Sequence, residues 1–364
     1  MKIAILAHLK HPIAQPYAGG LEMHTHLLTR TLQRRGHTVT LFAAHGSDPA
    51  LDLHTVCTPT GEAFADPVKA LAVDAAEFAA YTEMMAAVAR GGFDLVHNNS
   101  LHDLPLRASR GLGVPMVTAL HTPPFASLAA GVAAAFPRMT FAAVSKSLAQ
   151  EWRVLVPHAH VIGNGIDLSI FRFRAEPTEP PYAFWSGRIV PEKGLHLAID
   201  AARLAGLPLT FAGPRTDIAY WTKDIAPRLG PDLTDLGHLS HGALAEHLGR
   251  ATVALVTPRW EEPFGLVVAE ALSCGTPVAA FARGALPDLI ARSCGRCARA
   301  DDVADLARAI GEAIRLDRQA CRACGEALFD VETMTDRYEA LYHSILAAAP
   351  ACEQPGRMLD AVAV

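Results

Sequence analysis

The sequence predicts an α/β protein with two domains, each built on a parallel, doubly wound sheet. The chain has 364 residues, which at roughly 100 to 200 residues per domain suits two domains. Short apolar segments alternate with helical patterns along the chain, as in parallel sheets covered by helices. Hydrophobic residues make up 51% and charged residues 19%, with dispersed Gly and Pro, so the composition excludes disordered, collagen-like and coiled-coil proteins.

The first half of the chain begins with a strand, a loop, a helix and a second strand. The apolar segment 3–6 predicts the first strand, and a polar loop after it ends at Gly19-Gly20. The helix begins near Leu21 and ends at Gly36. The further elements expected in this half are strand 39–42, helix 68–90, strand 95–97, helix 104–110 and strands 115–120 and 142–144.

Polar groups follow several of these strands. His97-Asn98-Asn99, His121-Thr122 and Ser145 each come directly after an apolar strand, and Ser145 can also cap the next helix. In open α/β sheets ligands bind outside the carboxyl ends of the strands. We therefore expect a ligand site at this edge of the first sheet.

A Pro-rich segment separates the two halves. We expect a first domain over residues 1–173, a linker over 174–181 and a second domain over 182–330, because the linker lacks any periodicity. The second series contains apolar strands at 182–185, 209–211, 253–256 and 277–281. A last helix, 331–347, is expected to cross back over the domain junction, and residues 348–364 are expected to form a loose tail.

Charge and targeting signals restrict the partners and the location. The formal net charge is −5, which gives no support to nucleic-acid binding. The apolar run 3–7 is too short for a signal peptide, and the Ala-rich stretch 125–136 is too short for a transmembrane segment. These features predict a cytoplasmic protein without a transmembrane segment, and leave open a weak, peripheral contact with the inner face of the membrane.

The seven cysteines favour reduced thiols. The two pairs Cys294/Cys297 and Cys321/Cys324 resemble a zinc ribbon superficially, so structural zinc stays an open alternative. The segment between the pairs reads as an amphipathic helix, which suits a zinc knuckle poorly.

Two cations stand on a Gly-containing turn after the strand 182–185. Arg188 and Lys193 flank this turn, and a helix begins at Leu195. Such cations can converge on a diphosphate, to which the amides of a helix N-terminus also donate. The alternative is that both are solvated surface charges.

The segment 261–271 is more specific. Pro263 and Gly265 mark a turn, a helix begins at Leu266, and the amides there are free to meet an anion. Glu262 precedes the helix and Glu270 lies one turn inside it. The apolar residues around Glu270 argue against a pair of ordinary surface carboxylates.

Taken together, these motifs resemble the retaining, nucleotide-sugar-dependent glycosyltransferases of family four, the group 1 glycosyltransferases. The resemblance is collinear over about residues 2–347, and it implies the GT-B fold, in which two Rossmann-like domains face each other across a cleft. The motifs that carry it are 19–22, 34–39, 143–145, 162–167, 187–194, 262–270 and 284–288.

This resemblance implies how the donor is bound. Arg188 and Lys193 would neutralise the pyrophosphate and the departing nucleoside diphosphate, with no need for a metal or other cofactor. Glu270 would bind the ribose, and Glu262 would hold the sugar and the β-phosphate. The remaining donor contacts are expected from Gly19, Gly20, Asn164, Gly187, Leu239, Phe264, Gly265 and Leu266.

The implied catalytic residues are His121, Glu262, Arg188 and Lys193. His121 ends a strand and is similar to the family's histidine near the anomeric carbon. No enzymatic nucleophile is evident, which fits a front-face substitution with retention. We expect transfer of a hexose, first of all glucose from UDP-glucose, to a hydroxyl group.

The acceptor pocket is expected in the first domain, formed by residues 8–24, 97–103 and 121–130. The residues expected to contact it are Glu22, His24, His97, Asn98, Thr122 and Phe125. A small metabolite, a glycan or a lipid-linked sugar would each suit such a pocket. A metal site at His24 and His26 is disfavoured because residues two apart on a helix do not face each other.

Alternatives of other classes stay open. A nucleotide-sugar epimerase has a similar two-domain architecture, and a catalytically inactive nucleotide-sugar-binding protein would keep the same motifs. An NAD-dependent dehydrogenase would need a G-x-G-x-x-G turn after the first strand, and residues 7–20 contain none.

Overall fold

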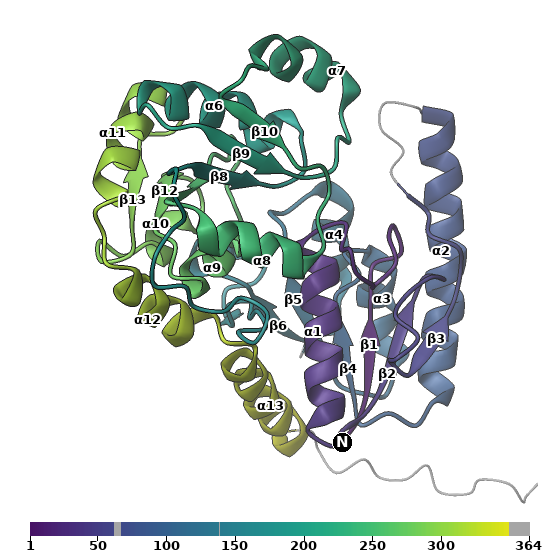
Figure 1. Ribbon diagram of the computed structural model, residues 1–364. Coiled ribbons are helices and arrows are strands. Elements are labelled where there is room, and N and C mark those ends of the chain that lie inside the picture. Colours follow the sequence, from purple (N-terminus) through teal and green to yellow (C-terminus); the bar gives the residue numbers. More distant parts are fainter. Residues whose placement is uncertain (62–66, 138, 349–364) are drawn as a thin grey trace, which may run out of the picture.

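A computed structural model of the chain describes residues 1–61, 67–137 and 139–348. It contains two parallel sheets, each covered by helices, which confirms the predicted fold class (Figure 1). The expected tail lies outside the described residues, apart from Ala348.

The first sheet has seven strands in the order β3-β2-β1-β4-β5-β6-β7. Its strands are β1 (Lys2–Leu6), β2 (Thr38–Ala43), β3 (Leu53–Thr55), β4 (Leu95–Asn98), β5 (Met116–Leu120), β6 (Thr140–Ala143) and β7 (His160–Val161). Ile3 of β1 pairs with Val39 of β2 on one side and with Leu95 of β4 on the other. The strand order therefore reverses between β1 and β4, the position at which doubly wound sheets form a ligand crevice.

The second sheet has six strands in the order β10-β9-β8-β11-β12-β13. Its strands are β8 (Ala183–Ser186), β9 (Leu209–Ala212), β10 (Leu233–Asp235), β11 (Val253–Val256), β12 (Val278–Phe281) and β13 (Gly295–Ala298). The order reverses between β8 and β11, so the Arg188 and Glu262 loops leave neighbouring strands.

The helices follow the expected alternation. The helices of the first half are α1 (Gly20–Arg34), α2 (Pro67–Arg90), α3 (Asp103–Ala108), α4 (Ala126–Ala134) and α5 (Lys146–Trp152). Those of the second half are α6 (Leu195–Leu204), α7 (Ile218–Tyr220), α8 (His241–Arg250), α9 (Leu266–Ser273), α10 (Leu286–Leu289), α11 (Val303–Ala313), α12 (Arg318–Phe329) and α13 (Val331–Ala348).

Strand β1 shows why the first sheet is apolar on both faces. Ile3 and Ile5 pack in the same cluster as Leu28 of α1, whereas Leu6 packs with Tyr81 of α2 on the other face. Each fully buried aliphatic side chain of this kind stabilises the fold by about 1.5–3 kcal/mol. Because both faces are covered, the strand reads as a continuous apolar run instead of an alternating one.

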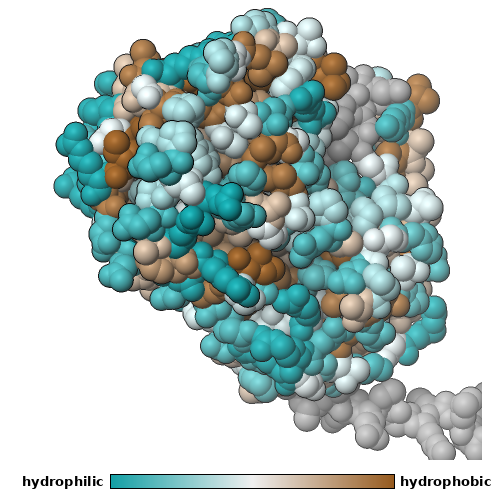
Figure 2. Space-filling model, viewed as in Figure 1, coloured by the Kyte–Doolittle hydropathy of each residue, from teal (hydrophilic) through white to brown (hydrophobic). Residues whose placement is uncertain are grey.

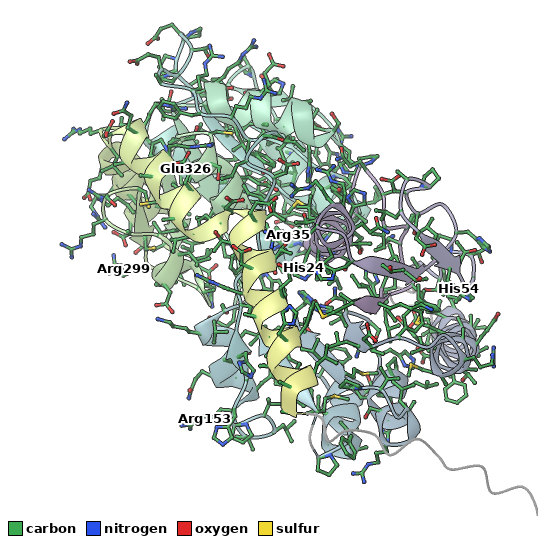
Figure 3. The ribbon with its side chains drawn as sticks, turned by 90° about the horizontal axis from the view of Figure 1, so that it is seen from below. His24, Arg35, His54, Arg153, Arg299 and Glu326 are labelled. Carbon is green, nitrogen blue, oxygen red and sulfur yellow. The ribbon has the colours of Figure 1, made fainter. Side chains whose placement is uncertain are left out.

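Helix α13 crosses back to the first domain, as predicted, and lies beside α1 (Figures 1 and 3). Arg35, at the end of α1, binds the carboxylates of Glu332, Asp336 and Glu339 on α13. Deeper in the same contact, the Tyr342 hydroxyl lies 2.7 Å from His97 Nδ1 of β4. The C-terminal helix is therefore part of the first domain's core as well as of its surface.

The described cysteines are free thiols. Cys294 and Cys297 flank and enter β13, whereas Cys321 and Cys324 lie on α12. Within the described residues, no group of three or more His, Cys, Asp or Glu side chains is arranged to hold a metal ion. The zinc alternative therefore gains no support, and burial raises the pKa of Cys321 to about 12, as in an inert thiol.

The surface mixes residue types. The face drawn in Figure 2 intersperses hydrophilic and hydrophobic residues. No helix within residues 1–61, 67–137 and 139–348 is both long enough and apolar enough to cross a membrane.

Candidate active site

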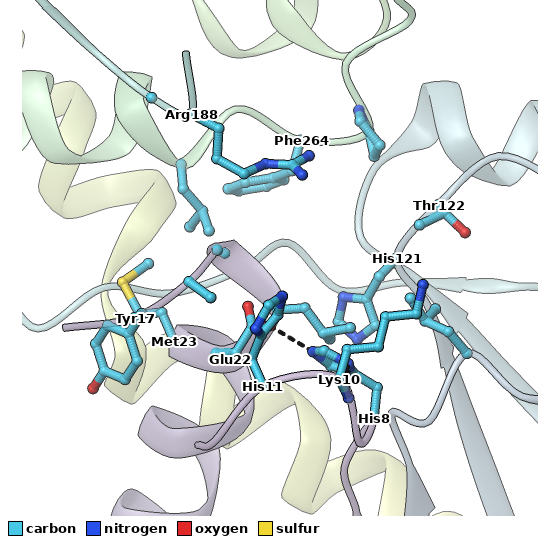
Figure 4. Close-up of a pocket in the computed structure, with 18 of the residues that line it drawn as sticks. His8, Lys10, His11, Tyr17, Glu22, Met23, His121, Thr122, Arg188 and Phe264 are labelled. Atoms are coloured by element: carbon cyan, nitrogen blue, oxygen red, sulfur yellow. Dashed lines mark hydrogen bonds and ion pairs between the residues drawn. The ribbon is translucent and has the colours of Figure 1, made fainter. Parts of the chain in front are cut away.

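A cavity of about 1030 Å³ lies between the two domains, at the carboxyl edges of both sheets. We call it the interdomain cavity. Its first-domain wall comes from helix α2 and the loops after β1, β4 and β5, and its second-domain wall comes from the loops after β8, β9 and β11 and the start of α9. Figure 4 shows Arg188 and Phe264 of the second domain opposite Glu22 and His121 of the first. This volume is at the upper end of small-molecule sites, so it can hold a nucleotide sugar together with a second substrate.

The two cations of the second domain lie on the cavity, and one of them is already paired. Lys193 Nζ is 2.7 Å from Glu262 Oε2, and the indole Nε1 of Trp260 donates to the same oxygen at 3.0 Å. The Lys193 ammonium also lies 5.1 Å from the centre of the Trp260 ring, a distance typical of a cation–π contact. Sequence reasoning predicted the roles of Lys193 and Glu262 separately and missed both their pairing and Trp260.

Helix α9 offers an anion site at the cavity. Its N-cap is Gly265 with φ 106° and ψ 60°, a conformation that favours glycine, and no side chain caps the helix. The Val268 amide donates to the Gly265 carbonyl, and the amides of Leu266 and Val267 are left to a ligand. An anion beside Phe264 and Leu266 would meet these donors and the positive end of the helix.

Glu270 lies one turn inside α9 and is 5% exposed on the cavity. Desolvation alone raises the pKa of this carboxyl from 4.5 to about 8. A carboxylic acid that is protonated at neutral pH can both donate and accept hydrogen bonds. This property suits a partner with neighbouring hydroxyl groups.

The two domains touch at the loop before α1. A Cβ atom on Gly20 would lie 2.4 Å from Leu266 Cδ1 of the second domain, so a side chain at position 20 would displace the end of the Leu266 side chain. The backbone of residues 19–20 therefore lies directly opposite the N-terminus of α9. Part of the donor set predicted from the two domains is thus brought together at one point.

The first-domain wall contains a hydrogen-bonded pair that the sequence did not reveal. His8 Nε2 lies 2.6 Å from Glu22 Oε1, and both side chains are at most 10% exposed (Figure 4). The hydrogen bond and charge of His8 outweigh desolvation and hold the pKa of Glu22 below its usual value. Glu22 is therefore an ionised carboxylate fixed in place on the cavity wall.

His121 lies at the bottom of the cavity and is 8% exposed. Its Nε2 is 2.9 Å from Asn99 Oδ1. Burial, together with the nearby His24, His97 and His8, holds the pKa of His121 well below 6.5. The imidazole is therefore neutral at physiological pH.

Most of the expected site residues line this cavity. They are Gly19, Gly20, Glu22, His121, Thr122, Phe125, Asn164, Gly187, Arg188, Lys193, Leu239, Glu262, Phe264, Gly265, Leu266 and Glu270. Lining the cavity is compatible with the roles expected of them, and the roles themselves stay predictions.

His24, His97 and Asn98, for which acceptor contacts are expected, do not line the cavity: they are 0%, 0% and 1% exposed and lie behind its wall. Asn98 donates to Thr118 Oγ1 at 3.2 Å, inside the sheet. His97 is bound by Tyr342 of α13. His24, on the inner side of α1, packs against the rings of His121 and Tyr338 (Figure 3). His24 and His97 belong to the packing between β4, α1 and α13, whereas Asn98 lies between β4 and β5.

Several other lining residues were missed. Those from the first domain include Val73, Glu77, Phe78 and Tyr81 of α2, and those from the second include Trp185, Pro214, His241 and Trp260. The part of α2 among them carries no motif, because an Ala-rich helix gives no signal for which face meets a ligand. Trp260 did have a local signal, since it stands two residues before Glu262.

Comparisons with known proteins agree with this geometry. Residues 168–328 match the family model described as glycosyl transferases group 1, and residues 18–170 match the one described as glycosyltransferase family 4. Glycogen synthase of Mycobacterium tuberculosis is 30% identical over 80% of this chain and 81% of its own length. The MMP alpha-(1->4)-mannosyltransferase of Mycolicibacterium hassiacum is 25% identical over 97% of this chain and 100% of its own.

Solved structures show the same fold. Sucrose-phosphate synthase of Thermosynechococcus elongatus superposes with a TM-score of 0.76 at 22% identity, covering 96% of this chain and 100% of that one. The Anabaena protein HepE, solved in complex with UDP-glucose, superposes with a TM-score of 0.72 at 19% identity, covering 94% and 100%.

Proposed function

The chain belongs to the group 1 glycosyltransferases, and we propose that it transfers a hexose from a nucleoside diphosphate sugar to a hydroxyl acceptor with retention of configuration. The observation that carries this proposal is the convergence of Arg188, Lys193, Glu270 and the uncapped N-terminus of α9 on the interdomain cavity. UDP-glucose is the first donor to test, because HepE is solved with it and glycogen synthase is among the relatives.

Catalysis would come from stabilisation of the leaving group. As the bond between the anomeric carbon and the phosphate oxygen breaks, negative charge grows on the nucleoside diphosphate. Arg188, Lys193 and the amides of Leu266 and Val267 at the start of α9 would meet that charge. These groups belong to the chain itself, so the proposal needs no metal ion.

Lys193 would change partners when the donor binds. Its ammonium and the Trp260 indole both bind Glu262 Oε2. If Lys193 moved to a bound diphosphate, this oxygen would therefore keep the hydrogen bond from Trp260. Glu262 would then offer its other oxygen to a sugar hydroxyl. Glu270, protonated by burial, would exchange hydrogen bonds with the ribose hydroxyls.

The acceptor would enter from the first domain. Glu22, fixed by His8, supplies a hydrogen-bond acceptor on the cavity wall, and Thr122 and Phe125 lie on the loop that follows β5. A hydroxyl group placed there would attack from the face that the phosphate leaves, with the departing oxygen taking the proton. A small metabolite, a glycan or a lipid-linked sugar would fit these contacts.

Thermal unfolding with UDP, GDP, ADP, TDP and NAD, each with magnesium and with EDTA, tests the donor site first. A ligand at 100 times its Kd adds about 2.7 kcal/mol to the free energy of unfolding, which raises the Tm by several degrees. We expect one nucleoside diphosphate to do so equally in EDTA, and Arg188→Ala to lose most of the shift. A shift with NAD alone, or with no nucleotide, would contradict the proposal.

Transfer itself needs a second measurement. Incubation of the chain with the stabilising nucleotide sugar and a panel of hydroxyl acceptors should release the nucleoside diphosphate. The anomeric proton of the product, followed by NMR, should keep the configuration of the donor. Inversion of that centre would contradict a retaining mechanism.

A further inference from the structure

A chain of hydrogen bonds runs through the first domain from α13 to the interdomain cavity. Tyr342 binds His97 Nδ1 at 2.7 Å, and His97 Nε2 lies 3.0 Å from Asn99 Oδ1. The same Asn99 oxygen lies 2.9 Å from His121 Nε2. Of these four side chains only His121 reaches the cavity, so the other three form a support behind it.

The direction of each bond follows from the chemistry of Asn99. Its amide nitrogen lies 3.2 Å from Thr25 Oγ1, and its carbonyl oxygen faces the two histidines. A carbonyl oxygen only accepts, so Nε2 of both rings must carry the proton. The remaining nitrogen of a neutral imidazole is then a lone-pair acceptor, and on His97 it accepts from the Tyr342 hydroxyl.

We infer that Asn99 is a positioning residue that holds His121 as the Nε2–H tautomer and leaves its Nδ1 to accept a hydrogen bond from a substrate hydroxyl. Among the described residues no side chain or backbone group is bound to His121 Nδ1, whereas Nε2 is held by Asn99. His121 thus takes part as a hydrogen-bond acceptor. The inference rests on the proposed function, because the hydroxyl belongs to the sugar or to its acceptor.

The surroundings keep the ring neutral. His24 faces His121 from α1 with ring centres 4.7 Å apart, His97 lies beside it on β4, and His8 approaches from the loop after β1. Because burial lowers the pKa of His24 to about 3 and that of His97 to about 4, both rings are neutral and offer no negative charge that would stabilise a proton added at Nδ1. The groups that α13 contributes to this region are the hydroxyl-bearing Tyr338 and Tyr342, and Glu22, the nearest carboxylate of the wall, is bound to His8.

NMR of ¹⁵N-histidine-labelled protein reads the tautomer directly, with His121 identified by its loss in His121→Gln. We expect both His97 and His121 to show the neutral Nε2–H pattern, unchanged between pH 5.5 and pH 8. An Nδ1–H tautomer or an imidazolium at His121 in this range would overturn the inference. This measurement needs no substrate, so it stands apart from the outcome of the nucleotide-binding test.

Asn99→Asp keeps an acceptor at the same place and adds a negative charge. The carboxylate should raise the pKa of His121, so that its Nδ1 becomes protonated at the acid end of the range and kcat falls there. At the alkaline end kcat should approach that of the unmodified chain. Asn98→Asp, which buries a carboxylate at the neighbouring position without touching His121, should leave the His121 signals unchanged. If Asn98→Asp changed the His121 NMR signals in the same way as Asn99→Asp, the positioning role of Asn99 would be refuted.

Asn99→Leu removes the support altogether. We expect kcat to fall about tenfold, the value of one hydrogen bond of about 1.4 kcal/mol, while stabilisation by the nucleoside diphosphate is kept. If this variant does not fold, Tyr342→Phe weakens the same chain from its far end and should shift the His97 signals with a smaller loss of kcat. Unchanged kcat in a folded Asn99→Leu chain would contradict the positioning role. Absence of any nucleotide response in the unmodified chain would instead contradict the proposed function.

Discussion

Replacing Glu270 by glutamine should change how stability depends on pH, because burial raises the pKa of this carboxyl from 4.5 to about 8. At about 1.36 kcal/mol per pKa unit, ionised Glu270 is disfavoured in the folded chain by about 5 kcal/mol. The folded state holds the proton between these two values and the unfolded state releases it. The free energy of unfolding therefore falls as the pH rises through this window, by about 4 kcal/mol between pH 5 and pH 9.

Glutamine matches the shape of the protonated carboxyl and does not titrate. The difference in unfolding free energy between Glu270→Gln and the unmodified chain should therefore be small at pH 5 and grow in favour of the variant by about 4 kcal/mol at pH 9. Urea unfolding followed by circular dichroism at five pH values measures this difference. Taking the difference removes the contributions of histidines that titrate in both chains.

Glu326→Gln provides the matched control, since this carboxylate lies on the surface of α12 and is 53% exposed. The difference in unfolding free energy between this variant and the unmodified chain should be the same at all five pH values. If the difference in unfolding free energy between Glu270→Gln and the unmodified chain were also independent of pH, the argument that burial raises the pKa of Glu270 would be refuted.

Three further perturbations follow from contacts described above. Gly20→Val should raise the KM for the donor, because its side chain would collide with Leu266, and adding Leu266→Ala should restore part of the affinity; no recovery would show that this approach does not govern donor binding. Trp260→Phe keeps the ring beside Lys193 but loses the indole N–H, so kcat should fall about tenfold at an unchanged Tm, and an unchanged kcat would remove the indole from the site. Burial lowers the pKa of His97 from 6.5 to about 4, so the free energy of unfolding should fall by about 2 kcal/mol as the pH is lowered from 7 to 5. In urea unfolding of His97→Gln this decrease should be about 2 kcal/mol smaller. An unchanged dependence of the unfolding free energy on pH would contradict the prediction.

The fold was predictable because its signals are local. The strand at Lys2–Leu6 and the glycine before α9 each depend on a few neighbouring residues, and burial on both faces makes the parallel strands apolar throughout. Glu262 and Glu270 are likewise separated by only one turn and the start of one helix, so the sequence predicts that both face the same site.

The rest depends on residues that meet only after the chain has folded. Strand β4 is buried at every position, so its sequence does not show whether His97 or Asn98 faces a ligand. In the structure neither residue lines the interdomain cavity. The bond between Lys193 and Glu262 joins residues 69 positions apart, and its geometry is set by the packing of β8 against β11. The same holds for His8 and Glu22, which are brought together only when α1 docks on the first sheet.

The return of α13 to α1 and β4 also has a consequence for how the chain is made. The strands of the first sheet are complete at Val161, but the helix that covers His97 begins only at Val331. At about 5–20 residues per second, a ribosome needs roughly 10–30 s to synthesise the intervening chain. During that interval the nascent first domain exposes the surface that Tyr338 and Tyr342 later cover, so we expect it to depend on chaperones until α13 has been made.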